Sequence, residues 1–237
     1  MVELPSVPLG RPIQIPCLHG QSVLRLYRRA AYTVQMFPLM PLSDFLALLA
    51  LATAMAFTPG PNTTLSAALA ANRGLKAALP FCLAVPVGWM LLVLACSAGL
   101  GTVLQAVPAL RSGLTLLGVA YLLWLAWKLS QAQPLGEVQA DRLQVGFVQG
   151  VALQFVNIKA WMAALLVVQG WVTPGPLIER LAVVLPLMAA YALASNFSYA
   201  LLGAALRPWL QQGQRLAWFN RCMALLLALT ALWMALR

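Results

Sequence analysis

One uncharged stretch decides the fold: FLALLALATAMAFTPGPNTTLSAALAA, residues 45–71. It exceeds the roughly 20 apolar residues that a helix needs to cross a hydrocarbon core about 30 Å thick. The run Pro59-Gly60-Pro61 interrupts it, because two residues without a backbone N–H leave the carbonyls of Met55 and Phe57 without helical partners. The stretch therefore predicts a transmembrane helix whose backbone opens inside the membrane.

The composition of the whole chain indicates lipid as the surrounding medium. Of 237 residues, 62% are hydrophobic and 8% are charged, whereas soluble domains average about 45–50% and about 25%. The formal charge is +10, but the basic residues lie at the ends of apolar segments, so we expect no nucleic-acid partner. We predict an all-α, multi-pass integral membrane protein whose surroundings are the lipid bilayer.

Further uncharged runs predict about six transmembrane helices in all. The predicted spans cover residues 42–71, 77–103, 109–130, 145–172, 181–206 and 217–236, which together form a membrane transporter domain over residues 40–237. The third run is short, but the long side chains of Arg111 and Lys128 at its ends can snorkel and extend it.

Residues 1–39 differ from the rest of the chain. They hold five prolines and four arginines and no long apolar run, so we expect a disordered extension or a mis-assigned start, with Met40 as the true first residue. The alternative is a signal peptide with Arg28-Arg29 and a cleavage site at Ala54-Met55-Ala56. We discount it because the apolar content continues unchanged beyond that site.

Basic residues are distributed unevenly between the two sides of the predicted bundle, and this asymmetry sets orientation. The loops after the first, third and fifth spans hold Arg73, Lys76, Lys128, Arg142, Arg207, Arg215 and Arg221, against Arg111, Arg180 and Arg237 on the other side. Both termini then face outward from the plasma (inner) membrane. The four arginines of the extension would equalise the two sides, so this orientation depends on the extension being absent.

An odd number of spans in each half predicts two inverted three-helix repeats, the plan of many secondary transporters. The spacing within the two halves agrees. Pro59 follows Asp44 by 15 residues, and Asn157 follows Arg142 by 15 residues. In such a repeat, the first helices of the two halves meet near the middle of the membrane.

One charge falls deep inside a predicted span, away from its ends. Lys159 lies about 20 Å into the fourth span at 1.5 Å per residue, where a lysine costs about 2.5–3.5 kcal/mol. The acids, which all lie outside or at the edges of the spans, are Glu3, Asp44, Glu137, Asp141 and Glu179. The ammonium must then meet carbonyls beside Pro59 and Pro61, water or a substrate carboxylate, or lose its proton. The alternative is a shifted register that lets Lys159 snorkel to an interface.

Other polar residues in the spans have simpler interpretations. Thr58 and Asn62 flank the first break and can cap freed backbone groups or contact a solute, whereas a plain proline kink would need neither. Gln154 and the run Ser195-Asn196-Phe197-Ser198, with Tyr191 and Tyr199, favour contacts between helices. The pair Gly146 and Gly150 forms a GxxxG pattern, which allows close packing within the bundle or in a homodimer.

The chain lacks the patterns of membrane enzymes and metal sites. Its cysteines, Cys17, Cys82, Cys96 and Cys222, form no CxxC pair, and His19 is its single histidine. We therefore predict no enzymatic activity, no catalytic or metal-binding residues and no cofactor. An exporter of metal ions or other cations is disfavoured because the spans lack histidine and carboxylate ligands.

Two motifs resemble those of a known family. The first motif is Thr58-Pro59-Gly60-Pro61-Asn62, which precedes the basic turn Asn72-Arg73-Gly74, and the second is Asn157-Ile158-Lys159-Ala160, which follows Gly150. Both are similar to the signatures of the lysine exporter (LysE/RhtB) family. The resemblance covers Met40–Arg237. Ile158 stands where that family usually has proline, which weakens the expected break in the fourth span. Asn62 stands where many members carry an acid, which weakens the case for proton coupling through a membrane carboxylate.

The resemblance implies an exporter of amino acids such as lysine, threonine or homoserine, or of related small solutes, driven by an ion gradient or the membrane potential. We predict a secondary transporter that exports small zwitterions by alternating access, with a non-transporting scaffold or assembly factor as the alternative. The predicted substrate or pathway residues are Pro59, Gly60, Pro61, Asn62, Asn157 and Lys159, with Thr58, Gln154 and Asn196 as further pathway candidates. Lys159 would attract a carboxylate, the two asparagines would hydrogen-bond the polar head, and the Pro-Gly-Pro run would form a hinge.

Overall fold

The computed structural model describes residues 40–132 and 144–236. The chain divides into two units, Met1–Pro41 and Leu42–Arg237, and every described helix belongs to the second. The expectations for residues 1–39, and those for the charges of residues 137–142 and 237, lie outside the described residues.

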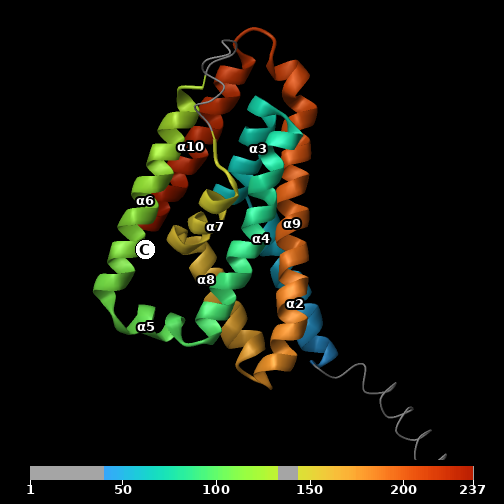
Figure 1. Ribbon diagram of the computed structural model, residues 1–237, viewed down its shortest axis with the longest axis vertical. Coiled ribbons are helices and arrows are strands. Elements are labelled where there is room, and N and C mark those ends of the chain that lie inside the picture. The colour runs from blue at the N-terminus through green and yellow to red at the C-terminus, as the bar shows by residue number, and fades with distance from the viewer. Residues whose placement is uncertain (1–39, 133–143, 237) are drawn as a thin grey trace, which may run out of the picture. The chain divides into compact units, whose positions relative to one another are not determined.

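Every regular element in the described part of the second unit is a helix (Figure 1). In chain order the elements are α2 (Leu42–Phe57), α3 (Pro61–Arg73), α4 (Leu75–Ser97), α5 (Leu100–Ala106), α6 (Pro108–Ser130), α7 (Phe147–Val156), α8 (Ile158–Val167), the π-helical turn η2 (Val168–Val172), α9 (Leu177–Leu210) and α10 (Arg215–Ala235). Helices α4, α6, α9 and α10 are each long and apolar enough to cross a membrane, and the number of spans rises to 6 if each bent pair is one span. The predicted all-α membrane protein is confirmed.

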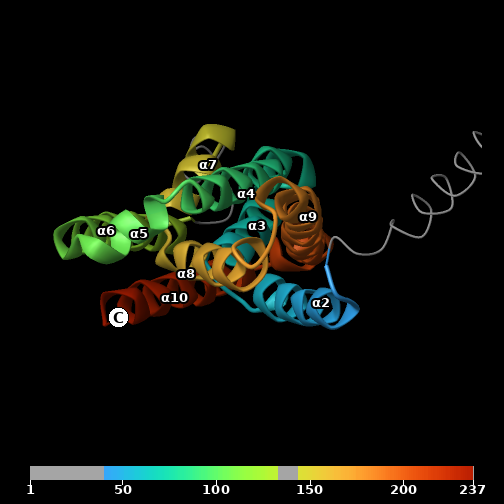
Figure 2. The same ribbon diagram turned by 90° about the horizontal axis from the view of Figure 1, so that it is seen from below.

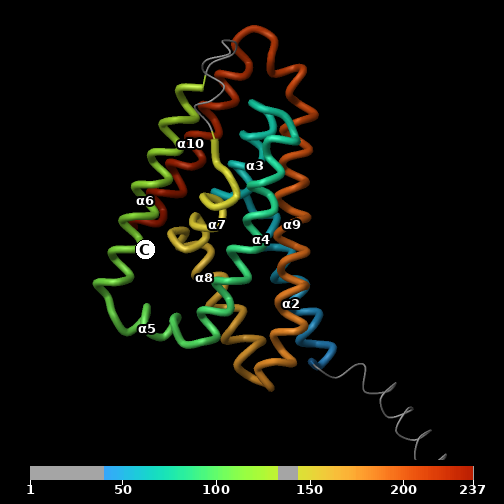
Figure 3. The backbone as a smooth tube through the Cα atoms, in the orientation of Figure 1, coloured from blue at the N-terminus to red at the C-terminus, as the bar shows by residue number. Residues whose placement is uncertain are grey.

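The helices pack in an arrangement that places the two broken spans at its centre. Helices α6 and α10 lie next to each other on one side of the bundle, and α2 and α9 lie on the opposite side (Figures 1 and 2). Helices α3, α4, α7 and α8 lie between these two pairs (Figure 2). The pair α2–α3 and the pair α7–α8 run through the bundle in opposite directions (Figure 3). This arrangement is compatible with inverted repeats, and the exact relation of the two halves stays a prediction.

The first break follows from its prolines. Helices α2 and α3 meet at 49°, and Pro61 is the first residue of α3, where a missing N–H is tolerated because the first helical N–H groups have no partner inside the helix. The backbone N–H of Gly60 donates to Thr63 Oγ1 at 3.0 Å, which closes the new helix start. The chain therefore resumes as a helix after only three non-helical residues, 58–60.

The second break corrects an expectation. The replacement of proline by Ile158 was expected to weaken it, yet α7 and α8 meet at 72°, a sharper bend than the first. The cause is Asn157, which is extended (φ −90°, ψ 101°) and whose side-chain oxygen accepts from the backbone N–H of Lys159 at 3.1 Å. This is an N-cap, which starts a helix without proline. The indole of Trp161 donates to the carbonyl of Phe155 at 2.7 Å, so the end of α7 is also satisfied.

The second predicted span, 77–103, is two helices in the structure. Helix α4 ends at Ser97, and α5 begins after Gly99, which has φ 99°. A left-handed residue at this point is a common helix stop that glycine adopts without strain. The chain therefore turns away at the end of α4 and forms a short separate helix before α6.

Glycines allow the helices at the centre to approach closely. A Cβ on Gly88 of α4 would lie 2.9 Å from the carbonyl oxygen of Val151 of α7, and one on Gly150 of α7 would lie 2.7 Å from Cβ of Ala84 of α4. Small residues at such crossings let membrane helices pack backbone to backbone. Gly150 thus packs within the bundle, which accounts for its part of the GxxxG pattern without a second chain.

Candidate functional site

A cavity of about 100 Å³ lies where the two breaks meet. Its lining from the breaks comprises Thr58, Gly60, Pro61 and Asn62 on one side and Asn157, Lys159, Ala160 and Ala163 on the other. Met55 and Ala56 of α2, Thr63 of α3, and residues of α4 and α9 complete the lining. The structure therefore brings together the two motifs that lie about a hundred residues apart in the chain.

Lys159 reaches the backbone opened by the first break. It is half-buried, and its Nζ donates to the carbonyl oxygen of Thr58 at 3.3 Å. The same Nζ lies 3.0 Å from the point where a Cβ on Gly60 would stand, so a larger residue there would push the ammonium aside. The acids of the described residues, Asp44 and Glu179, lie in the first turns of α2 and α9 and outside the cavity lining. Lys159 therefore meets a carbonyl in the bundle interior and does not snorkel to a span end.

Side chains of α9 satisfy the other carbonyls at the end of α2. The hydroxyl of Ser195 donates to the carbonyl of Ala56. The hydroxyl of Tyr199 donates at 3.0 Å to the carbonyl of Phe57, which Pro61 leaves without a helical partner. Sequence reasoning assigned both residues to packing, but they cap the open end of α2. Their spacing of four residues, which puts them on one helix face, was the available signal.

A reciprocal pair of amides joins the two broken spans. Asn62 Nδ2 donates to Gln154 Oε1 at 2.9 Å, and Gln154 Nε2 donates back to Asn62 Oδ1 at 3.1 Å. Gln154 is fully buried and also donates to the carbonyl of Gly150. Asn62 is thus paired with Gln154, and Asn157 is paired with the backbone N–H of Lys159, which it caps. A solute in the cavity would meet them as side chains already held in place.

A second polar contact lies beside the cavity on α9. Ser66 of α3 donates to Asn196 Oδ1 at 2.9 Å, and Asn196 Nδ2 donates to the carbonyl of Ala192 at 2.8 Å. Both side chains are buried. This contact orients Asn196, which lines the cavity.

The rest of the cavity wall is apolar. Met55, Val85, Trp89 and Met188 contribute to it, together with Tyr191, whose hydroxyl accepts from Thr53 Oγ1 at 3.2 Å. The cavity thus has a cationic side, formed by Lys159, and an apolar side that suits one small side chain. No group of three or more His, Cys, Asp or Glu in the described part of the chain could hold a metal ion.

Most of the predicted site residues lie together. Seven of them line the cavity: Thr58, Gly60, Pro61, Asn62, Asn157, Lys159 and Asn196. Pro59 and Gln154 do not line it; Pro59 lies in the first break, and Gln154 bonds Asn62. Sequence reasoning missed Trp89, Met55 and Met188, since apolar residues in an apolar span carry no signal of their own.

The family model of the LysE type translocators matches residues 53–237. The chain belongs to this family. The resemblance drawn from the two motifs is thereby confirmed, and both motifs fall within the matched residues. No solved structure matches the chain.

Several relatives of this translocator are efflux proteins. One, from Klebsiella pneumoniae subsp. pneumoniae and named a cysteine/O-acetylserine efflux protein, is 30% identical over 168 residues, 69% of this chain and 84% of the relative. A relative of the same name from Escherichia coli O1:K1 is 31% identical over 179 residues, 74% of this chain and 89% of its own length. The match to the one from Salmonella typhimurium spans 60% of that protein at 33% identity. The translocator is thus a multi-pass membrane protein of an exporter family, and its relatives are transporters rather than enzymes.

Proposed function

We propose that this translocator exports small neutral amino acids across the plasma membrane by alternating access, with Lys159 as the group that binds the substrate carboxylate. The observation that carries the proposal is the position of the Lys159 ammonium, which lies in a cavity between two broken helices and meets only a backbone carbonyl among the bonds described for it. An ammonium has three N–H donors, so the bond to Thr58 leaves donors for a carboxylate.

The two broken helices offer complementary ends to a zwitterion. Helix α8 begins at Ile158, so the positive end of its dipole and Lys159 both favour an anion at this point. Helix α2 ends at Phe57, and the negative end of its dipole favours a cation beside the carbonyls that Ser195 and Tyr199 already bond. A substrate carboxylate at α8 and its ammonium at the end of α2 would satisfy both ends together.

The cavity favours substrates with a neutral side chain. The acids Asp44 and Glu179 lie outside it, so a second ammonium, such as that of lysine, would have no anionic partner and would face Lys159. Met55, Met188 and Trp89 offer polarizable and aromatic contacts that suit an apolar or sulfur-bearing group. The relatives named for cysteine and O-acetylserine efflux agree with this size and charge, and we propose these two solutes as the first to test.

Alternating access is supported by where the polar contacts lie. Asn62–Gln154, Ser66–Asn196 and Asn72–Asn220 each join the first half of the chain to the second. Nearly the whole of α3 is buried, so the bundle is closed around it. Movement of one half against the other would exchange a few hydrogen bonds and would leave each half intact.

The orientation follows from the basic residues. The α3–α4 turn and the α9–α10 turn lie at the same end of the bundle (Figure 1), and they carry Arg73, Lys76, Arg207 and Arg215. By the positive-inside rule this end faces the cytoplasm. Export would then carry the solute from the side of α3 toward the side of α5.

Efflux from preloaded cells tests the proposal. Cells loaded with labelled cysteine or O-acetylserine should lose it faster when they express the wild-type protein than when they carry an empty vector. Lys159→Met should abolish this efflux, whereas Lys76→Met, which removes an exposed lysine at the start of α4, should retain it. Membrane fractions must show equal insertion of both variants. Unchanged efflux in Lys159→Met would refute the role of the ammonium, and no efflux of either solute by the wild type would favour a scaffold or another substrate.

A further inference from the structure

A second cavity, of about 220 Å³, lies between α5, α6 and α8 and takes no part in the proposed substrate site. Its walls are apolar, formed by Leu104, Ile158, Trp161, Met162 and Leu165. It is larger than the roughly 150 Å³ apolar cavity that stays dry in a protein core and takes up an apolar guest. A space of this size and lining is therefore suited to an apolar ligand rather than to water.

Three of the residues that line this cavity are polar. Gln105 of α5, and Arg111 and Thr115 in the first turns of α6, complete the lining. A guanidinium presents N–H groups in a planar fork that matches a phosphate, and the amide and hydroxyl add neutral hydrogen-bonding groups beside it. The lining thus combines one cationic side chain and two neutral polar ones with five apolar residues.

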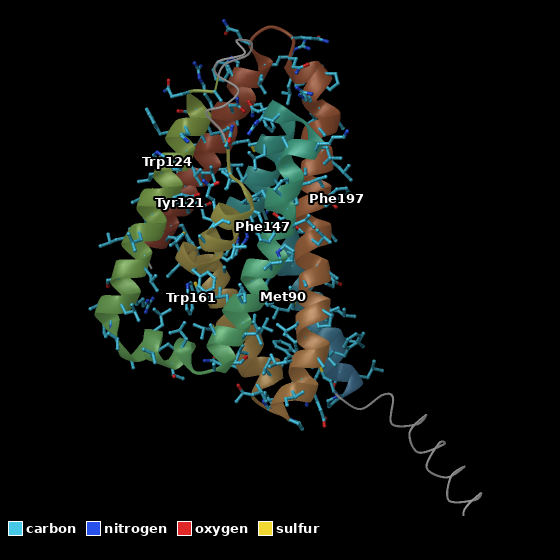
Figure 4. The ribbon with its side chains drawn as sticks, in the orientation of Figure 1. Met90, Tyr121, Trp124, Phe147, Trp161 and Phe197 are labelled. Carbon is cyan, nitrogen blue, oxygen red and sulfur yellow. The ribbon has the colours of Figure 1, made fainter. Side chains whose placement is uncertain are left out.

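Arg111 lies in the first turn of α6, directly after the connection from α5. Helix α5 joins the end of α4 to the start of α6 at one end of the bundle, and Trp161 lies on the side of α8 that faces α6 (Figure 4). Leu104, Ile158 and Trp161 are buried, whereas Arg111 is exposed. Met162 is also exposed, so the lining offers a cationic group at the surface and apolar side chains from the surface to the interior, which suits a phosphate and an acyl chain.

We propose that this cavity binds one phospholipid, with the phosphate at Arg111 and one acyl chain between α6 and α8. Ile158, Trp161, Met162 and Leu165 follow helical spacing and form one face of α8, whereas Lys159 and Ala163 face the first cavity. Helix α8 is therefore a shared wall. A bound acyl chain supports α8 on the side opposite Lys159, so the lipid holds the Lys159 ammonium at the end of α2. This consequence rests on the proposed transport function, whereas lipid binding itself does not.

Native mass spectrometry of the purified full-length protein tests the binding. After delipidation in detergent, the protein is titrated with dioleoyl phosphatidylglycerol, and in separate samples with oleate and with inorganic phosphate. The wild type should bind one phosphatidylglycerol molecule more tightly than it binds oleate or inorganic phosphate. Arg111→Gln should weaken this binding at least about tenfold. Arg180→Gln, which removes a cation near the start of α9 outside the cavity, should leave it unchanged.

A second variant keeps the charge and fills the space. Leu165→Trp should lower phosphatidylglycerol binding although Arg111 is intact, and size-exclusion chromatography should show a monodisperse protein. Equal lipid binding by the wild type, Arg111→Gln and Leu165→Trp would overturn the proposal, as would preference for oleate or phosphate alone. Lys159→Met should bind the lipid normally, so loss of transport in that variant and loss of lipid binding in Arg111→Gln are distinguishable failures.

Discussion

Asn220 ties α10 to α3 and to the end of α6, and its removal should destabilise the bundle more than any surface change. It is fully buried. Its Nδ2 donates to Asn72 Oδ1 and to the carbonyl of Ala132, each at 2.9 Å, and its Oδ1 accepts from Asn72 Nδ2 at 2.7 Å. Asn72 Nδ2 keeps a second acceptor, the carbonyl of Ala68. Asn220→Ala therefore leaves two acceptors, Oδ1 of the half-buried Asn72 and the carbonyl of the buried Ala132, without the donor that they share.

The magnitude follows from those two groups. A buried polar group left without a partner costs about 1–3 kcal/mol, whereas polar contacts between membrane helices average about 0.6 kcal/mol in double-mutant cycles. We expect Asn220→Ala to lower the free energy of unfolding by about 2–4 kcal/mol. Because Asn72 and Asn220 act as a pair, the double variant Asn72→Ala with Asn220→Ala should cost less than the sum of the single variants.

Equilibrium unfolding in mixed micelles, followed by circular dichroism, measures this loss. Thr230→Ala on the same helix is the matched control, because its hydroxyl is exposed and bonds only the carbonyl of Leu226 one turn earlier. The control should stay within about 0.5 kcal/mol of the wild type. If Asn220→Ala also stays within that range, or if the two asparagine substitutions are additive, the Asn72–Asn220 pair does not stabilise the contact between α10 and α3.

Three further predictions follow from the packing and the site. Gly88→Leu should prevent the close α4–α7 crossing and lower the yield of folded protein, because its Cβ would lie 2.7 Å from Gln154 Cγ. The control Gly113→Leu should fold normally, because nothing lies within 4 Å of that Cβ position. Equal yields of the two variants would show that the close crossing is not needed for folding. Tyr199→Phe leaves the carbonyl of Phe57 unpaired and should cost about 1 kcal/mol of stability, a drop of about 2–4 °C in the temperature of thermal unfolding. Ser198→Ala should change this temperature little, because the Ser198 hydroxyl bonds within its own helix. Equal shifts in the two variants would argue against Tyr199 as the cap of α2. Excess lysine should not slow the efflux of labelled cysteine although excess alanine should, and strong competition by lysine would show that the cavity accepts a second cation.

The first broken span could be predicted from the sequence because its cause is covalent. Pro59 and Pro61 lack the N–H groups that a helix needs, whatever surrounds them. The meeting of Lys159 with this break was also predicted, since an ammonium without an acid nearby must find another partner. What the sequence did not identify was the carbonyl itself: the bond goes to Thr58, while the carbonyl freed by Pro61, that of Phe57, goes to Tyr199.

The second break could not be predicted with the same certainty. Asn157 forms an N-cap only because its backbone is extended, and many asparagines in spans bond to neighbouring helices instead. The rotation of α9, which decides that Ser195 and Tyr199 face α2, depends on packing against several helices at once. The cavity beside Arg111 was not anticipated because it is bounded by three helices that the linear sequence does not place together.

Direct binding to the purified protein tests whether Lys159 binds a substrate carboxylate in the cavity between the broken helices. The measurement compares cysteine with cysteamine, which lacks the carboxylate, in the wild type and in Lys159→Met. A lost charge-assisted hydrogen bond costs about 1.5–3 kcal/mol, or about tenfold to a hundredfold in Kd. The wild type should prefer cysteine by about this factor, and Lys159→Met should bind the two compounds equally weakly. An undiminished preference for cysteine in Lys159→Met would contradict this role of Lys159.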